Sequence, residues 1–191
     1  MTGTTREPPD GGGIAAPGTA AVVELAIWQL ADHFSAVMRS RDLIRGAYTT
    51  LGMAPEVVDD AVVMVSELVT NAIQHACGPY ELRLYRRGTS VVCEVVDGSH
   101  VLPRVPPPPG PPLTLGDIDA IADFERLETG RGLDVVNRLS GGRCWTHPTK
   151  TRTTDPVVMG KCVAFALDLP GAPVPASPLG PGRSPDLPGL P

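Results

Sequence analysis

The spacing of apolar residues predicts a long amphipathic helix in the first half of the chain. From Pro55 to about Cys77, apolar side chains recur every three or four positions, as they do on the buried face of a helix. Pro55 suits the first turn of this helix, and Gly78-Pro79 ends it. We expect its buried face to consist of Val58, Ala61, Val62, Val65, Val69, Ala72 and Ala76.

Alternating apolar and polar positions predict strands on both sides of this helix. Residues 81–86 and 91–97 form two antiparallel strands joined by a turn at Arg87-Gly88-Thr89. Together these patterns predict an α+β fold, a two-layer sandwich in which helices cover one face of a mixed β-sheet. The other predicted elements are strands at 22–28, 142–146 and 162–169 and helices at 32–51 and 132–139.

Composition divides the chain into one domain and two tails. Residues 1–19 and 170–191 are rich in Gly, Pro, Ser and Ala, so we expect both to be disordered. Residues 20–169 are long enough to form one domain with its own core. Within that domain, residues 100–129 contain runs of proline that enter neither a sheet nor a helix interior, which predicts a long loop.

The formal net charge of −5 argues against a nucleic-acid-binding surface, which needs a basic face. No segment approaches the roughly 20 apolar residues of a membrane span, and Glu7 and Asp10 make the start a poor signal peptide. We therefore expect a cytoplasmic protein with a protein partner.

Cysteine and histidine spacings indicate neither a disulfide framework nor a metal motif. The cysteines that lie in or beside predicted strands, Cys93, Cys144 and Cys162, are expected to be buried free thiols. Cys77 has no partner at Cys-x-x-Cys spacing. The four histidines, His33, His75, His100 and His147, show no metal-ligand spacing either.

Candidate chemistry begins on the long helix, where Glu67, Asn71 and His75 follow one another at i, i+4 steps. This spacing lines the three side chains up on the face opposite the apolar stripe, toward solvent or a pocket. By itself such a row is more often a solvated stripe. Its meaning depends on Asp97, which ends a strand, and on Gly130-Arg131-Gly132-Leu133, which opens a helix.

These three segments, in this order, resemble the N, G1 and G2 boxes of the GHKL-type (histidine-kinase-like) ATPase domain, which has the Bergerat-type ATP-binding fold. The resemblance extends over about residues 20–169 and is strongest to the bacterial anti-sigma-factor serine/threonine kinase-like regulators. It implies that residues 100–129 form an ATP lid and that the cofactors are ATP and Mg²⁺.

The resemblance also implies roles for individual residues. Asn71 would hold Mg²⁺, and Glu67 would act as the general base, one helical turn away. Asp97 would accept a hydrogen bond from the adenine amine, although a turn-forming aspartate is the alternative. Gly130, Arg131, Gly132 and Leu133 would contact the phosphates at the start of a helix. His75 would reach the phosphates or the lid, or else be a structural histidine.

Two segments depart from the family pattern. The usual Asp-x-Gly is replaced by Asp97-Gly98-Ser99, which leaves the geometry of that turn open. The later Gly-Thr box is replaced by Gly160-Lys161-Cys162, which offers no hydroxyl.

Three functions remain open. The first is a serine/threonine kinase of the anti-sigma type that binds a protein partner, such as a sigma factor, and phosphorylates an antagonist, with Arg41 and Arg45 facing the partner unless they form only a solvated basic edge. The second is a nucleotide-gated binding module without phosphoryl transfer, which the altered last box and proline-rich lid favour. The third is the ATPase half of a histidine kinase, which is disfavoured because no helical dimerisation pair with a phosphoacceptor histidine fits before Ala20. A homodimer remains open.

Overall fold

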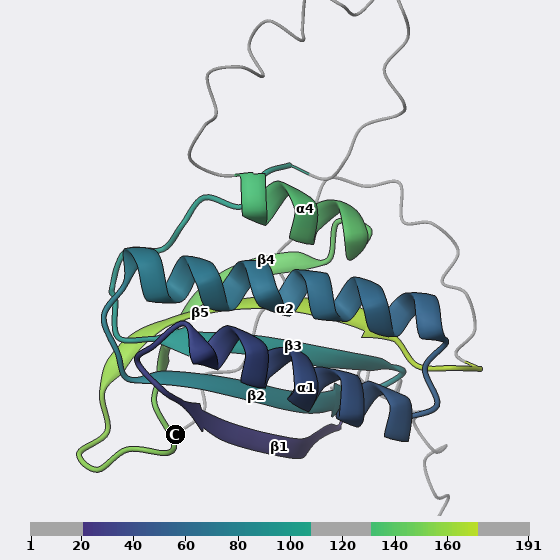
Figure 1. Ribbon diagram of the computed structural model, residues 1–191, viewed down its shortest axis with the longest axis horizontal. Helices are drawn as coiled ribbons and strands as arrows, with labels where there is room; N and C mark the ends of the chain where they lie inside the picture. Colours follow the sequence, from purple (N-terminus) through teal and green to yellow (C-terminus); the bar gives the residue numbers. More distant parts are fainter. Residues whose placement is uncertain (1–20, 108–130, 172–191) are drawn as a thin grey trace, which may run out of the picture.

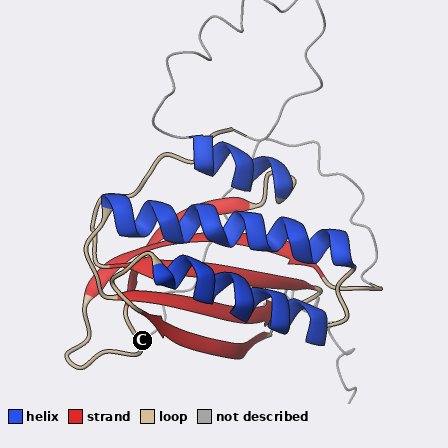
Figure 2. Cartoon of the chain, in the orientation of Figure 1, coloured by secondary structure: helices blue, strands red, loops and turns tan. Residues whose placement is uncertain are grey.

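The computed structural model describes residues 21–107 and 131–171, in which helices cover one face of a five-stranded sheet (Figure 1, Figure 2). The predicted α+β class, with helices on one face, is confirmed. The elements are, in chain order, β1 (Val22–Leu30), α1 (Ser35–Thr50), α2 (Pro55–His75), β2 (Tyr80–Arg87), β3 (Ser90–Asp97), α4 (Arg131–Leu139), β4 (Cys144–Lys150) and β5 (Met159–Asp168).

The sheet is antiparallel throughout, so the prediction of a mixed sheet was wrong. Its strand order is β1-β2-β3-β5-β4, and every neighbouring pair is antiparallel. A connection through a helix, such as α4 between β3 and β4, usually joins parallel neighbours. Here β3 and β4 do share a direction, but β5 lies between them and pairs antiparallel with both.

The core lies between the helices and the inner face of the sheet. The predicted apolar stripe of α2 is buried there, apart from Ala76, which follows the helix and is half-buried. Alternate strand residues meet this stripe, and each large buried side chain contributes about 1.5–3 kcal/mol to stability. The strand residues of this core include Leu82, Leu84, Val91, Cys93, Val95, Val163 and Phe165.

The helix and strand boundaries differ from the predicted ones by a few residues. The helix α1 begins at Ser35 rather than near Asp32, because the chain first turns and the Ser35 N–H donates to His33 Nδ1 at 3.1 Å. The predicted β2–β3 turn is confirmed, and its Gly88 has a φ of +59°, which glycine adopts without strain.

The expected burial of three thiols is also confirmed. Cys93, Cys144 and Cys162 are buried and free, whereas Cys77 is exposed. Among the described residues, no helix combines the length and the apolar character that a membrane crossing requires.

Candidate functional site

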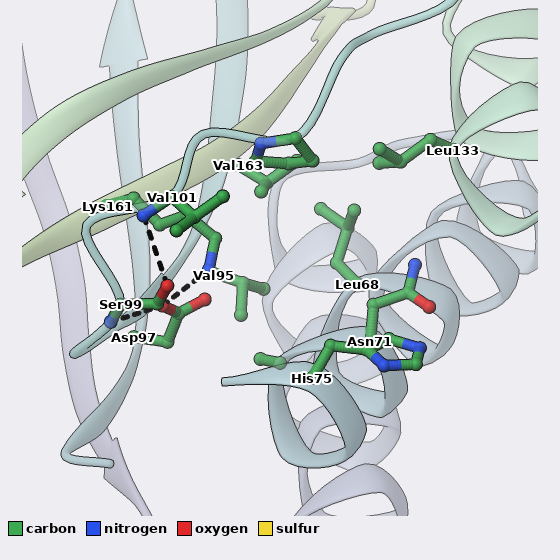
Figure 3. Close-up of a pocket in the computed structure, with 12 residues that line it drawn as sticks. Leu68, Asn71, His75, Val95, Asp97, Ser99, Val101, Leu133, Lys161 and Val163 are labelled. Carbon is green, nitrogen blue, oxygen red and sulfur yellow. Dashed lines mark hydrogen bonds and ion pairs between the residues drawn. The ribbon is translucent and has the colours of Figure 1, made fainter. Parts of the chain in front are cut away.

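A pocket of about 370 Å³ opens between α2 and the inner face of the sheet (Figure 3). Asn71 and His75 line it from α2, and Asp97 lines it from the end of β3, on the opposite side (Figure 3). The volume falls within the range of pockets that hold small ligands. The remaining lining is mostly apolar and includes Leu68, Ala72, Val95, Val101, Pro103, Leu133 and Val163.

The start of α4 approaches the polar row of α2 closely at Gly132. A Cβ atom at this position would lie 2.8 Å from Glu67 Oε2 and 2.9 Å from Asn71 Nδ2. Those distances are too short for a methyl group, so only glycine leaves both side chains where they are. The structure therefore brings Gly132, at the start of α4, next to Glu67 and Asn71, from which it is more than 60 positions away in the sequence.

Asp97 ends β3 in a buried ion pair. Lys161 is its direct partner in the register of β3 and β5, and Lys161 Nζ donates to Asp97 Oδ1 at 2.7 Å. The same oxygen accepts the Ser99 N–H at 2.9 Å, which closes the Asp97-Gly98-Ser99 turn. No described group donates to the other carboxylate oxygen of Asp97, which leaves it available to a ligand in the pocket.

The turn after β3 is held by two close backbone approaches. A Cβ at Gly98 would lie 2.6 Å from the carbonyl oxygen of Gly78, and the Gly98 N–H donates to Cys77 O at 2.8 Å. A Cβ at Gly160 would lie within 1.9 Å of the Asp97 carbonyl oxygen. The two glycines therefore fix the direction in which Asp97 and Lys161 enter the pocket.

Glu67 borders a second cavity, of about 280 Å³, between α1 and α2. Arg41 and Arg45 line the same cavity. Arg41 is held in place, because its Nε donates to Ser66 Oγ at 2.6 Å, while Arg45 lies 3.7 Å from the carboxylate of Asp42. Glu67 thus lies beside the pocket, on the side of the two arginines.

Some predicted site residues lie outside the described part of the chain. These are Gly130, the side chain of Arg131, and the lid from residue 108 onward. Leu133 is described and lines the pocket.

Lys161 lines the pocket but was not predicted from the sequence. In the sequence it differs from the family pattern only in replacing a residue with a hydroxyl. The register of β5 against β3 sets Lys161 opposite Asp97. Sequence patterns alone do not predict that register, so they could not show that Lys161 reaches the pocket.

Comparison with known proteins gives a family match over residues 30–153, more than half of the chain, to the model described as the histidine kinase-like ATPase domain. The matched segment contains Glu67, Asn71, Asp97 and Gly132 and ends before Lys161. A comparison with curated proteins gives no match.

Among solved structures, the chain is similar to one described as the crystal structure of the SiaB–SiaC complex from Pseudomonas aeruginosa. The TM-score is 0.46 and the sequence identity 12%, over 75% of this chain and 91% of that chain. A likeness of this size carries no conclusion about function.

Proposed function

The chain belongs to the histidine kinase-like ATPase domain family, and from this premise we propose that it is a regulatory protein that binds Mg-ATP and phosphorylates a protein antagonist. The observation that carries the proposal is the cradle in which Gly132 admits Glu67 and Asn71 beside the start of α4. A methyl group at position 132 would collide with both side chains, so glycine is what lets the start of α4 approach them this closely.

The residues in this cradle fit Mg²⁺ and phosphate. Mg²⁺ prefers oxygen ligands and accepts only one or two from the protein while it keeps water and phosphate oxygens. Asn71 offers one carboxamide oxygen, and the first N–H groups of α4 suit an anionic phosphate. Asn71 would hold Mg²⁺, which when bound would supply neutralisation of the phosphate charge.

Asp97 and Lys161 suit the base end of the nucleotide. The free carboxylate oxygen of Asp97 can accept a hydrogen bond from the exocyclic amine of adenine. The Lys161 ammonium, which has three N–H donors, gives only one of them to Asp97. The apolar lining between the two ends, with Val95, Val163 and Leu133, suits the flat faces of a purine.

In the proposed reaction, Glu67 acts on a hydroxyl of the partner rather than on the adenine. A serine or threonine hydroxyl that enters from the second cavity would pass Arg41 and Arg45 before it reaches the Glu67 carboxylate. In the proposed reaction, Glu67 accepts the hydroxyl proton, the hydroxyl oxygen bonds to the γ-phosphorus, and ADP leaves. The proposed protein partner is a sigma factor or an anti-sigma antagonist of the resembled regulators.

The alternative is a nucleotide-gated binding module that holds its partner without phosphoryl transfer. The Lys161–Asp97 ion pair favours it, because Lys161 stands where the family pattern has a hydroxyl. In that case ATP would control the partner surface, and Glu67 would contribute only to binding.

The deciding experiment measures ATP binding and phosphoryl transfer separately. Mg-ATP at ~100 times its Kd should stabilise the fold by about 2.7 kcal/mol, which corresponds to a Tm increase of about 5–10 °C, and Mg-GTP should do clearly less. Labelled ATP would then be incubated with the protein and its co-purified partners. Glu67→Gln should keep the thermal shift but lower phosphorylation by ~10² or more.

Glu56→Gln is the matched control, because Glu56 is exposed in the first turn of the same helix. Glu56→Gln should change neither the thermal shift with Mg-ATP nor the phosphorylation of the partner. If Mg-ATP produces no shift, both functions fail. If ATP retains the partner but wild-type protein transfers no phosphate, the binding module replaces the kinase.

A further inference from the structure

A second cluster of polar side chains lies on the outer face of the sheet, away from the helices and the pocket. Glu94, His147 and Cys162 come from β3, β4 and β5, three neighbouring strands. Cys162 is the direct partner of His147 in the β4–β5 register. Glu94 lies diagonally opposite Cys162 in the β3–β5 register. One ligand atom from each lies within 4.8 Å of the others.

The two ring nitrogens of His147 each face an oxygen acceptor. Its Nδ1 lies 2.9 Å from the carbonyl oxygen of Pro148, and because a carbonyl only accepts, Nδ1 carries the hydrogen. When the ring is neutral, the lone pair of Nε2 faces Glu94 Oε1, 3.2 Å away. Two acceptors that face each other need a cation between them, either a proton or a metal ion.

We propose that Glu94, His147 and Cys162 bind a divalent transition-metal ion, with Zn²⁺ the best match. A thiol, an imidazole and a carboxylate form the mixed donor set that Zn²⁺ takes, whereas Mg²⁺ and Ca²⁺ take oxygen alone. From zinc bond lengths, a nitrogen and an oxygen ligand stand roughly 3.3 Å apart around a tetrahedral ion. The 3.2 Å between Nε2 and Oε1 matches this spacing.

The groups around the three ligands hold two of them in place. Tyr85 OH donates to Glu94 Oε1 at 2.6 Å, and Pro148 fixes the His147 ring. Such outer contacts are the usual support of metal ligands. Arg83 is the cation nearest to Glu94, at 3.7 Å, but its charge is compensated by Glu81 at 2.7 Å.

The charge balance allows the ion. Among Glu81, Arg83 and Glu94, which are all buried, one negative charge remains when His147 is neutral. A divalent ion with the Cys162 thiolate adds a single net positive charge and makes the cluster neutral. Burial raises the pKa of the Cys162 thiol, so the metal must displace its proton, and one proton leaves for each ion bound.

Access to the site is from the His147 side, because that side chain is 22% exposed while Glu94 and Cys162 are buried. The ion would join three strands behind the pocket. Lys161 precedes Cys162 on β5 and faces the opposite side of the sheet, so the metal would brace the strand that carries Lys161.

The experiment uses the full chain with Cys77→Ser, which removes the exposed thiol. Co²⁺ is titrated as the probe. We expect one equivalent to bind with a thiolate-to-cobalt absorption band, and we expect Zn²⁺ to displace it and raise the Tm. Cys162→Ala and His147→Gln should each abolish the band and the Zn²⁺ effect.

Cys144→Ala is the matched control, because Cys144 is also a buried thiol but belongs to the core on the helix face. It should keep the band. The proposal is wrong if no thiolate band forms, if the band survives Cys162→Ala, or if Zn²⁺ leaves the Tm unchanged. If Cys162→Ala does not fold, His147→Gln decides, since its partly exposed ring can be replaced with less disturbance.

Discussion

Replacement of Gly132 by alanine should separate nucleotide binding from folding. The added methyl group would meet Glu67 Oε2 at 2.8 Å and Asn71 Nδ2 at 2.9 Å, so both side chains must move away. The Glu67 and Asn71 side chains are only partly buried, and the methyl group would meet their terminal atoms. Their movement should therefore have little effect on the stability of the fold. Alanine in place of glycine within a helix increases the free energy of unfolding by up to about 1 kcal/mol.

The loss in binding should be much larger than the change in stability. A hydrogen bond or ligand contact to a charged group is worth about 1.5–3 kcal/mol, so loss of one such contact weakens Mg-ATP binding roughly 10- to 150-fold. Isothermal titration calorimetry would measure the affinity, and thermal unfolding would measure the fold. We expect the Tm of Gly132→Ala to equal or slightly exceed that of the wild type.

Gly46→Ala in α1 is the matched control, because a Cβ there meets nothing within 4 Å. It should stabilise the fold by about 1 kcal/mol and leave the affinity unchanged. The cradle reasoning is refuted if Gly132→Ala binds Mg-ATP as tightly as the wild type, or if it loses both binding and several degrees of Tm.

Three further predictions concern single side chains. Asn71→Ala should weaken ATP binding chiefly when Mg²⁺ is present, while Asp97→Asn should weaken ATP and ADP alike; equal effects of Asn71→Ala with and without Mg²⁺ would contradict the metal assignment. Lys161→Met should destabilise the fold by about 3–5 kcal/mol, because it leaves Asp97 buried without its cation. The double variant with Asp97→Asn should lose less than the sum of the single losses, and additive urea-unfolding energies would show that the pair is not coupled. Burial alone would raise the pKa of Glu81, but hydrogen bonds from Thr153, Arg152 and Arg83 outweigh it and lower the pKa below 4.5. Its contribution to stability is therefore complete above pH 4.5 and is lost as the pH falls through the lowered pKa, so the stability gap between wild type and Glu81→Gln should shrink in acid; a constant gap would refute this.

Local patterns in the sequence were enough for the elements and for part of the pocket. The α2 stripe and the alternation in β2 and β3 are one-dimensional periods, and each element showed its period within its own residues. Helix geometry placed Asn71 and His75 together on one face of α2, but opposite its apolar stripe, whereas in the structure they line the pocket at the edge of that stripe, beside Leu68 and Ala72.

The order of the strands and the contacts between them were decided only by the tertiary structure. The insertion of β5 between β3 and β4 made the sheet antiparallel, and it also set Lys161 against Asp97 from 64 positions away. The same pairing gathered Glu94, His147 and Cys162, whose spacings in the sequence match no metal motif. Strand pairing depends on which apolar faces share one core and on how the chain returns to the sheet, and neither is encoded in the period of a single segment.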